Sequence, residues 1–160
     1  MLATATGEAR PALMPLPEKA HNCRHCPARA KSACAAASAD DLDRLSGLVS
    51  PQQLMAGDTL IEEGDAASHV FTVTAGSMKI YKLLPDGRRQ VTGFLFRGDF
   101  LGLAFDDCYT YSAEALTDTT VCRFARRAFE EFVQDRPMME RRLRAMASNE
   151  LAAAQDQMVL

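Results

Sequence analysis

The sequence predicts an α+β fold in which a small antiparallel β-roll is flanked by helices. Between residues 51 and 125, short runs rich in Val, Ile, Thr and aromatic residues alternate with glycines, which is typical of successive short strands. On both sides of this segment, apolar residues recur at helical spacing. The glycines that separate the expected strands are Gly57, Gly64, Gly76, Gly87 and Gly98.

The bulk composition indicates one soluble domain with appendages. The chain has 160 residues, of which 48% are hydrophobic and 24% charged, and its net charge is −3. A weakly acidic chain lacks the basic surface that a DNA-contacting domain usually carries. The N-terminus lacks the apolar core of a secretory signal, and no run approaches the ~18 apolar residues of a membrane span. We therefore expect a cytoplasmic protein with no membrane partner.

Three units precede the expected strands. Residues 1–20 are rich in Ala, Pro, Thr and Glu without periodicity, which predicts a flexible tail. The cysteine-rich segment 21–37 follows. A helix then begins at Ser38 or Asp40, either of which can cap it, and Pro51 is expected to end it. The apolar stripe of this helix consists of Leu42, Leu45, Leu48 and Val49.

A hairpin is predicted at Pro85–Gly87. The proline presets the turn and the glycine supplies a positive φ between two strand-like runs. In the earlier run 70–74, alternate residues are expected on opposite faces. One face would carry Val70, Thr72 and Thr74, and the other Phe71 and Val73. With their flanking helices, these strands form a sensor unit that we place at residues 38–136.

The C-terminal part of the sequence is helical in pattern. Phe129, Phe132 and Val133 lie on one stripe of a short helix that Pro137 interrupts. Residues 137–160 then show a repeat close to a coiled-coil seam, which predicts a dimerisation helix. The predicted seam residues are Met139, Leu143, Met146, Ala147, Glu150, Leu151, Ala154 and Met158. The same stripe could instead cover the β-roll of its own subunit. We expect Arg136, Arg141, Arg142 and Arg144 to form a solvated face paired with Glu140.

Five cysteines in a cytoplasmic chain favour metal ligands or buried thiols over disulfides. Two residues separate Cys23 from Cys26, and seven more separate Cys26 from Cys34, so one loop offers three thiolates. Iron–sulfur clusters generally need four. The remaining candidates are Cys122, in a strand-like run, and Cys108, where neighbouring carboxylates disfavour a thiolate.

Two other interpretations of these cysteines stay open. His21 or His25 could complete a zinc site within the loop, since zinc binds mixed Cys and His ligands. Cys122 could equally be a buried structural thiol, which is the ordinary role of a cysteine in a strand.

Motifs in the second half of the sequence resemble a known family. GDF-x-G at 98–102, followed by a loop and SA-x-A at 112–115, is similar to the cyclic-nucleotide-binding fold of the Crp/Fnr transcription regulators. AGDTLIEEGD at 56–65 and the run at 73–99 resemble strands of the same β-roll. The resemblance extends from about residue 21 to 160 and implies a double-stranded β-helix, or jelly roll.

Family members that bind cyclic AMP carry a Glu just after the last glycine of GDF-x-G and an Arg before the Ser-Ala pair. The phosphate needs a cation and the ribose diol needs an acceptor. Here Leu103 and Tyr111 stand at those positions. We therefore expect no cyclic nucleotide.

The N-terminal cysteines, together with QVTGF at 90–94, resemble the Fnr (fumarate and nitrate reduction regulator) branch. This resemblance implies a [4Fe–4S] cluster that oxygen degrades. Its ligands would be Cys23, Cys26, Cys34 and Cys122, with Cys108 as the alternative fourth ligand. The chain would be no enzyme but the sensor and dimerisation domain of an oxygen-responsive regulator of anaerobic or microaerobic genes, in which cluster assembly promotes dimerisation. The gap between the second and third cysteines is longer than in the enteric type member.

The resemblance also implies partners. The C-terminal helix would form a homodimer, and the exposed turn formed by Asp86, Gly87, Arg88 and Arg89 corresponds weakly to a region that contacts RNA polymerase. Family members read promoter DNA through a winged helix-turn-helix that follows the dimer helix, whereas this sequence stops at Leu160. We therefore expect polymerase and promoter DNA to be partners of a longer parent only. A cluster-free, effector-binding β-roll and a zinc-stapled interaction domain remain as other functions.

Overall fold

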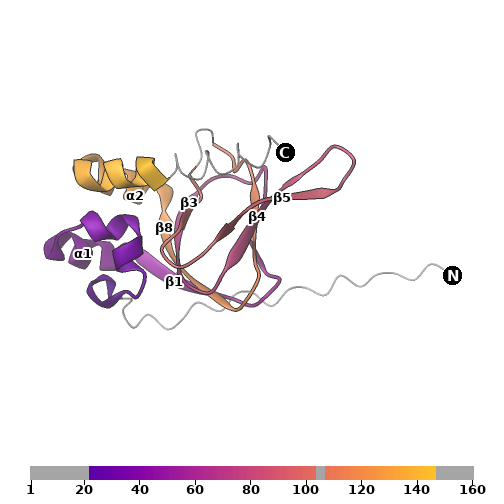
Figure 1. The fold of residues 1–160 in the computed structure, drawn as a ribbon. Helices are drawn as coiled ribbons and strands as arrows, with labels where there is room; N and C mark the ends of the chain where they lie inside the picture. Colours follow the sequence, from indigo (N-terminus) through magenta and orange to yellow (C-terminus); the bar gives the residue numbers. More distant parts are fainter. Residues whose placement is uncertain (1–21, 104–106, 147–160) are drawn as a thin grey trace.

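The computed structural model describes residues 22–103 and 107–146. Figure 1 shows a β-roll with a helical layer at one side. In chain order the elements are the 3₁₀ turns η1 (Cys23–His25), η2 (Arg29–Lys31) and η3 (Ala33–Ala36), the helix α1 (Ala39–Ser46), the strands β1 (Val49–Leu54), β2 (Thr59–Ile61), β3 (His69–Ala75), β4 (Met78–Leu83), β5 (Arg89–Leu95), β6 (Phe100–Leu101), β7 (Ser112–Ala115) and β8 (Thr119–Ala125), and the helix α2 (Arg126–Gln134). Residues 137–146 are also helical.

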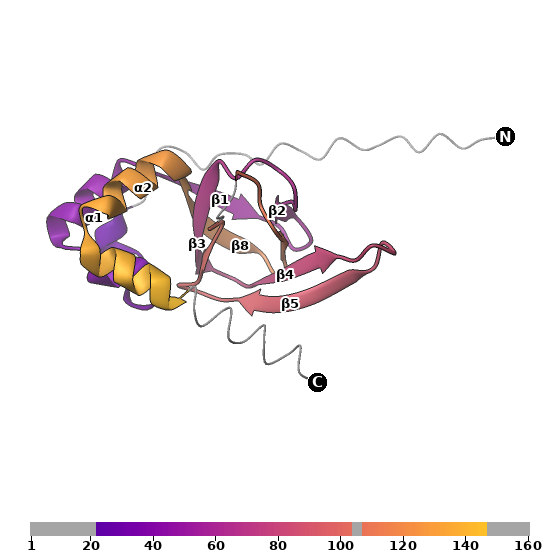
Figure 2. The same cartoon turned by 90° about the horizontal axis from the view of Figure 1, so that it is seen from above.

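The described strands form two antiparallel sheets of four strands, in the orders β1-β8-β3-β6 and β2-β7-β4-β5. The sheets face one another and enclose an inner apolar core. The helical elements pack on the outside of β1, β8 and β3, where a second core lies (Figure 2). The predicted α+β fold with an antiparallel β-roll is confirmed.

Strand β3 is buried on both faces, because it separates these two cores. Val70 belongs to the outer core beneath the helices, whereas Phe71 and Val73 belong to the inner core between the sheets. The predicted alternation is therefore confirmed. Thr72 and Thr74 are buried as well, and the Thr74 hydroxyl donates to the carbonyl of Thr120, which satisfies its polar group.

Helix α1 begins as predicted and ends earlier than predicted. The Ser38 hydroxyl accepts from the backbone N–H of Asp41, whose carboxylate accepts in return from the Ser38 N–H, a capping box. Leu42 and Leu45 are fully buried in the outer core. The helix ends at Ser46, followed by Gly47.

Two sequence-based predictions for this helix are wrong. Leu48 is exposed and Val49 begins β1, so neither extends the apolar stripe of α1. Pro51 does not end the helix but lies inside β1, opposite Cys122 of β8. A proline is tolerated there because β1 is an edge strand, with a hydrogen-bonded neighbour on one side only.

The predicted hairpin at Pro85–Gly87 is confirmed. It joins β4 to β5, which pair antiparallel. Gly87 has a φ of 86°, and its N–H donates to the carbonyl of Leu84 at 2.9 Å. Other side chains pay a steric penalty at such a φ, so the glycine fits the turn.

The C-terminal helices cover the outer core. Phe129, Phe132 and Val133 of α2 are buried there, as their spacing predicts, and Pro137 begins the next helical stretch after a break. Met139 and Leu143 were predicted to lie in a dimer seam, but both are buried against the core of their own chain. Met146 is partly buried against the same core.

This part of the stripe follows the alternative interpretation, because α1 and the β-roll wall already cover it. The other predicted seam residues lie outside the described residues, namely Ala147, Glu150, Leu151, Ala154 and Met158.

Two neighbouring methionines test this correction. Met139 is 0% exposed and Met138 is 63% exposed. We expect Met139→Ala to lower the free energy of unfolding by about 2–4 kcal/mol, because it leaves a cavity in the core. Met138→Ala should change it by less than about 0.5 kcal/mol. Urea unfolding at two protein concentrations measures both. If Met139→Ala lowered the free energy of unfolding only at the higher protein concentration, Met139 would instead lie in a dimer interface.

Candidate metal centre

The cysteine segment is built from three short 3₁₀ turns. Cys23 opens η1, Cys26 caps its end, and Cys34 lies in η3. Side chains of the segment stabilise these turns locally. The Asn22 side chain accepts from the N–H of Arg24, and the Ser32 hydroxyl accepts from the N–H of Cys34. Both residue types favour such caps because a short polar side chain can reach a nearby backbone donor.

The first turn is attached to helix α1. The N–H of Cys23 donates to the Ser46 hydroxyl at 3.0 Å, and this hydroxyl donates in turn to the carbonyl of Leu42. Arg24 forms a bidentate pair with Asp43 at 2.6 and 2.7 Å. Since the ion pair is about half exposed, it adds little stability but fixes the direction of the turn.

The segment also lies directly against the β-roll at Gly98. A Cβ atom built on this glycine would lie 2.5 Å from the Cβ of Lys31 and 2.9 Å from its backbone carbon. Gly98 also has a φ of 95°, a conformation that other residues adopt at a cost. Only glycine therefore allows this close approach between the turn before β6 and the cysteine segment.

Strand β8 brings Cys122 to the same place. Residues alternate along β8, so Val121 enters the inner core while Cys122 and Phe124 enter the outer one. Cys122 and Cys23 are both buried in the outer core, and Cys34 packs against it. Sheet topology thus joins cysteines from two segments that are far apart in the sequence.

Burial is the main influence on the thiols. It raises the pKa of Cys23, raises the pKa of Cys34 to about 11, and raises that of Cys122 further. The charges of the other cysteines add to this, since Cys34, Cys26 and Cys23 all raise the pKa of Cys122. Cys23 and Cys122 share the outer core and Cys34 packs against it, while Cys26 ends the turn that Cys23 opens.

Three of these thiols also lie beside a hydroxyl. Ser46 beside Cys23, Ser32 beside Cys34 and Thr72 beside Cys122 each lower the thiol pKa, against the effect of burial. The Ser46 and Ser32 hydroxyls donate to the carbonyls of Leu42 and Arg29 and accept from the backbone N–H groups of Cys23 and Cys34. These two hydroxyls therefore hold the backbone at both cysteines in place.

The donor set fits an iron–sulfur cluster in its chemistry. Four thiols is the number that a [4Fe–4S] cluster takes, and buried thiols with raised pKa values give up their protons when a cation replaces them. Across residues 22–103 and 107–146, no three His, Cys, Asp or Glu side chains are grouped closely enough to hold a single metal ion. In a cluster, by contrast, each thiolate binds a different iron atom.

The alternative ligands lie elsewhere. Cys108 is exposed, forms an isolated bridge with Ala66, and belongs to neither core. His25 is exposed at the end of η1, and His21 lies outside the described residues. The geometry favours Cys122 over Cys108 as the companion of the N-terminal cysteines.

Comparison with known proteins gives the family. Residues 51–136 match the family model for the cyclic nucleotide-binding domain. The chain belongs to this family, in its Crp/Fnr branch. The nitrogen fixation regulation protein FixK of Bradyrhizobium diazoefficiens is 36% identical over 94% of this chain and 64% of its own length. The transcriptional activator protein FnrL of Cereibacter sphaeroides is 34% identical over 91% of this chain and 58% of its own length.

The chain thus spans less than two thirds of these Crp/Fnr relatives. Among solved structures, FixK2 from Bradyrhizobium japonicum superposes with a TM-score of 0.64 and 33% identity, over 71% of this chain and 57% of that chain. The catabolite activator protein of Thermus thermophilus, at 17% identity and a TM-score of 0.65 over 76% of this chain and 59% of that one, shares the fold. Among the described helices, none combines the length and apolar character needed to cross a membrane.

The nucleotide cassette of the Crp/Fnr fold has an altered lining here. Leu103 is exposed, and Tyr111 packs against the inner core. The Tyr111 hydroxyl accepts from the backbone N–H of Gly102 at 2.8 Å. The side chain at position 111 is therefore neutral and is hydrogen-bonded to the backbone of the GDF-x-G turn.

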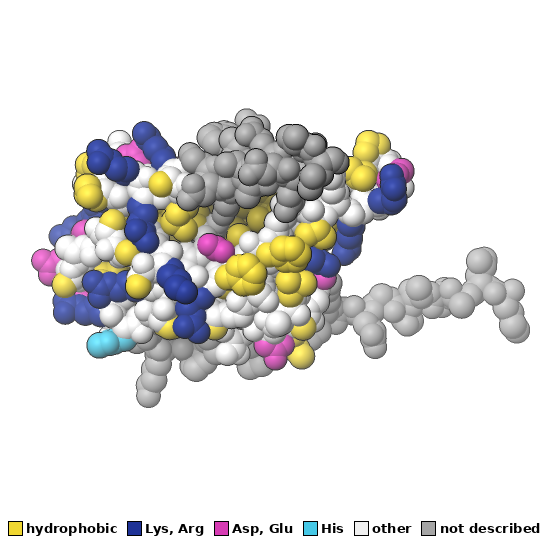
Figure 3. Space-filling view, viewed as in Figure 1, with side chains coloured by type: hydrophobic (Ala, Val, Ile, Leu, Met, Phe, Trp, Pro, Cys, Tyr) yellow, Lys and Arg dark blue, Asp and Glu magenta, His cyan; other side chains and the backbone are white. Residues whose placement is uncertain are grey.

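The hairpin tip offers little free charge. Arg88 pairs with Asp86 at 2.6 Å, while Arg89 pairs with Glu114 at 3.2 Å and lies over the ring of Tyr81. The surface beside this tip carries exposed apolar side chains, and Figure 3 shows hydrophobic groups gathered over the β4–β5 region. These exposed residues include Leu83, Val91, Phe94 and Phe96.

The burial order of the thiols predicts their reactivity in the metal-free protein. We expect iodoacetamide at pH 8 to modify Cys108 first and Cys122 last, because Cys108 is exposed and the raised pKa of Cys122 keeps its thiol protonated. With a pKa of about 11, Cys34 is only about 0.1% thiolate at pH 8, so its rate should rise about tenfold per pH unit up to pH 10. Peptide mass spectrometry follows each site. In urea the differences between the modification rates of the cysteines should disappear. Equal rates in the folded protein would contradict the burial of Cys34 and Cys122.

Proposed function

We propose that this chain is the sensory domain of an iron–sulfur-dependent, oxygen-responsive transcription regulator that controls anaerobic or microaerobic genes. The observation that carries the proposal is that Cys23 and Cys122 share the outer core with Cys34 packed against it, while Cys26 lies at the end of η1 in the same segment. Membership of the Crp/Fnr family and relatives that are named as transcriptional activators support the regulatory part.

The four cysteines would be the ligands of a [4Fe–4S] cluster. When bound, such a cluster supplies an oxygen-labile cross-link between the cysteine segment and β8. The chain's own residues do the rest. The apolar core around Cys23 and Cys122 keeps water away from this side of the site, and the hydroxyls of Ser46 and Ser32 hold the backbone N–H groups of Cys23 and Cys34.

The cross-link would act on the C-terminal helix through the cysteine segment. With the cluster present, the segment is tied to β8 as well as to α1. Without it, the remaining attachments are those to α1, the contact at Gly98 and the hydrogen bonds to residues 137–146. Loss of the cluster would therefore loosen the segment, an order–disorder switch of a kind that many sensors use. Residues 137–160 would carry the result to a second subunit, and a longer parent protein would bind promoter DNA and RNA polymerase.

A cyclic nucleotide is not part of this proposal. Leu103 offers no acceptor for the ribose, and Tyr111 offers no cation for the phosphate. Oxygen sensing by the cysteines would thus replace ligand binding inside the roll.

Anaerobic reconstitution with iron and sulfide tests the proposal on matched variants. Wild type and Cys108→Ser should each take up about four irons per chain and show a broad visible absorption band that air bleaches. Cys122→Ser should bind less than half as much iron, because it lacks the fourth thiolate. Iron and sulfide analysis with absorption spectra measures the difference.

The other outcomes identify the competing functions. A colourless protein that holds one zinc per chain would indicate a zinc-stapled interaction domain. A colourless, folded protein without metal would point to a cluster-free, effector-binding roll. If Cys108→Ser lost iron while Cys122→Ser retained it, Cys108 and not Cys122 would be the fourth ligand.

A further inference from the structure

An arginine of the C-terminal helix reaches into the cysteine segment. The Nε of Arg142 donates to the carbonyl of Ser32 at 2.7 Å, and its Nη2 donates to the carbonyl of Ala30 at 3.2 Å. The pattern of charges alone predicted a solvated face here. Instead, this side chain joins two segments that are more than a hundred positions apart in the sequence.

The two carbonyls lie where one 3₁₀ turn gives way to the next. Ser32 ends η2 and begins η3, and it is buried. Its carbonyl also accepts from the N–H of Ala35. A planar guanidinium can donate to both carbonyls at once, whereas the single ammonium of a lysine lacks this forked geometry.

Ser32 connects this contact to a candidate ligand. The Ser32 hydroxyl accepts from the backbone N–H of Cys34 at 3.2 Å and donates to the carbonyl of Arg29 at 3.2 Å. One residue therefore carries the carbonyl that Arg142 holds and the hydroxyl that orients Cys34. A movement of Cys34 would displace the acceptor of Arg142.

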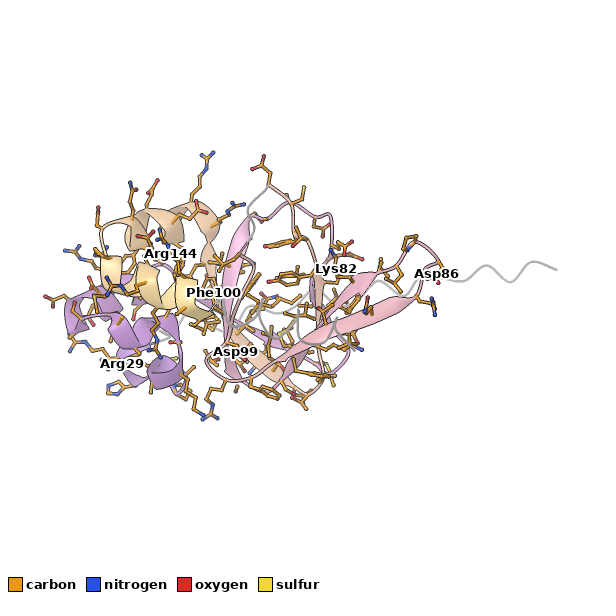
Figure 4. The ribbon with its side chains drawn as sticks, turned by 45° about the horizontal axis from the view of Figure 1, so that its top comes forward. Arg29, Lys82, Asp86, Asp99, Phe100 and Arg144 are labelled. Carbon is orange, nitrogen blue, oxygen red and sulfur yellow. The ribbon has the colours of Figure 1, made fainter. Side chains whose placement is uncertain are left out.

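Arg136 and Arg144 of the same region make different contacts. Arg136 pairs with Asp41 of α1 at 2.7 Å and donates to the carbonyl of Phe132, so it fixes the start of the helix to α1. Arg144, labelled in Figure 4, is 77% exposed and pairs with Glu140 of its own helix. That Arg144 pair was predicted and is confirmed.

We propose that Arg142 is the positioning residue that couples the cysteine segment to the C-terminal helix. Arg136 attaches the start of this helix to α1 in every state. The Arg142 contact forms when residues 30–34 hold the described conformation, and it breaks when they leave it. The contact itself is independent of any metal. That the cluster is what moves the segment rests on the proposed function.

Hydrogen exchange on the full chain without metal, under reducing conditions, tests the coupling directly. Arg142→Gln should raise amide exchange by about tenfold both in residues 30–36 and in residues 137–146, because two charge-assisted hydrogen bonds are lost. Arg144→Gln is the matched control and should change neither segment. Arg142→Lys should give an intermediate effect. Alkylation of Cys34 at pH 9 should accelerate in parallel with the exchange.

A rise confined to one segment, or an equal rise in Arg144→Gln, would overturn the coupling. If far-ultraviolet circular dichroism shows that Arg142→Gln is unfolded, amide exchange in Arg142→Lys replaces it. A rise in both residues 30–36 and residues 137–146 of that variant supports the coupling, and a rise in only one of them rejects it.

A second arm separates this inference from the proposed function. In anaerobically reconstituted protein, sedimentation compares the dimer dissociation constants with and without the cluster. Arg142→Gln should keep the iron content of wild type while the ratio of the two constants falls at least about tenfold towards one. Absence of iron in wild type would reject the proposed function and leave the exchange result standing. Normal iron with an unchanged ratio would reject the role of Arg142.

Discussion

The packing of the helical elements on the outside of the β1-β8-β3 sheet is the constraint on which the rest of the structure depends. Leu42 and Leu45 of α1, Phe129 of α2 and Met139 of the last described helix share one apolar core with strand residues of the sheet. A helix with one apolar stripe has to bury it against another element, and here all the stripes meet on the same wall. The cysteine segment precedes α1 directly, so the same core determines where its thiols lie.

This arrangement gives the outer core two roles that conflict. Apolar surroundings stabilise the packing, yet they raise the pKa values of the buried thiols and so disfavour the charged form that a metal needs. The hydroxyls of Ser46, Ser32 and Thr72 offset part of this penalty at Cys23, Cys34 and Cys122. In the metal-free protein these influences keep the buried thiols protonated, so a cation that bound them would have to displace the protons.

Periodicity and turn chemistry were enough to predict the strands, the hairpin and the stripe of α2, because each depends on residues close together in sequence. Pro51 was misinterpreted because its tolerance depends on β1 being an edge strand, which only the sheet order shows. The seam at Met139 was misassigned since one apolar stripe fits a partner subunit and the chain's own core equally well. Neither the approach of Gly98 to Lys31 nor the bonds of Arg142 could be predicted, as both join distant segments through backbone atoms.

The two cores have different contents. Tyr111 packs against the inner core between the sheets, and its hydroxyl accepts from the N–H of Gly102. The candidate centre lies in the other core, in contact with α1 and the C-terminal helix. Strand β3 separates the two and is buried on both faces. Ser32 and Arg142 connect the outer core to the last described helix by direct contact, whereas a ligand of the inner core would have to act across this strand. A change at the cysteines would therefore have a shorter path to this helix than a change inside the roll.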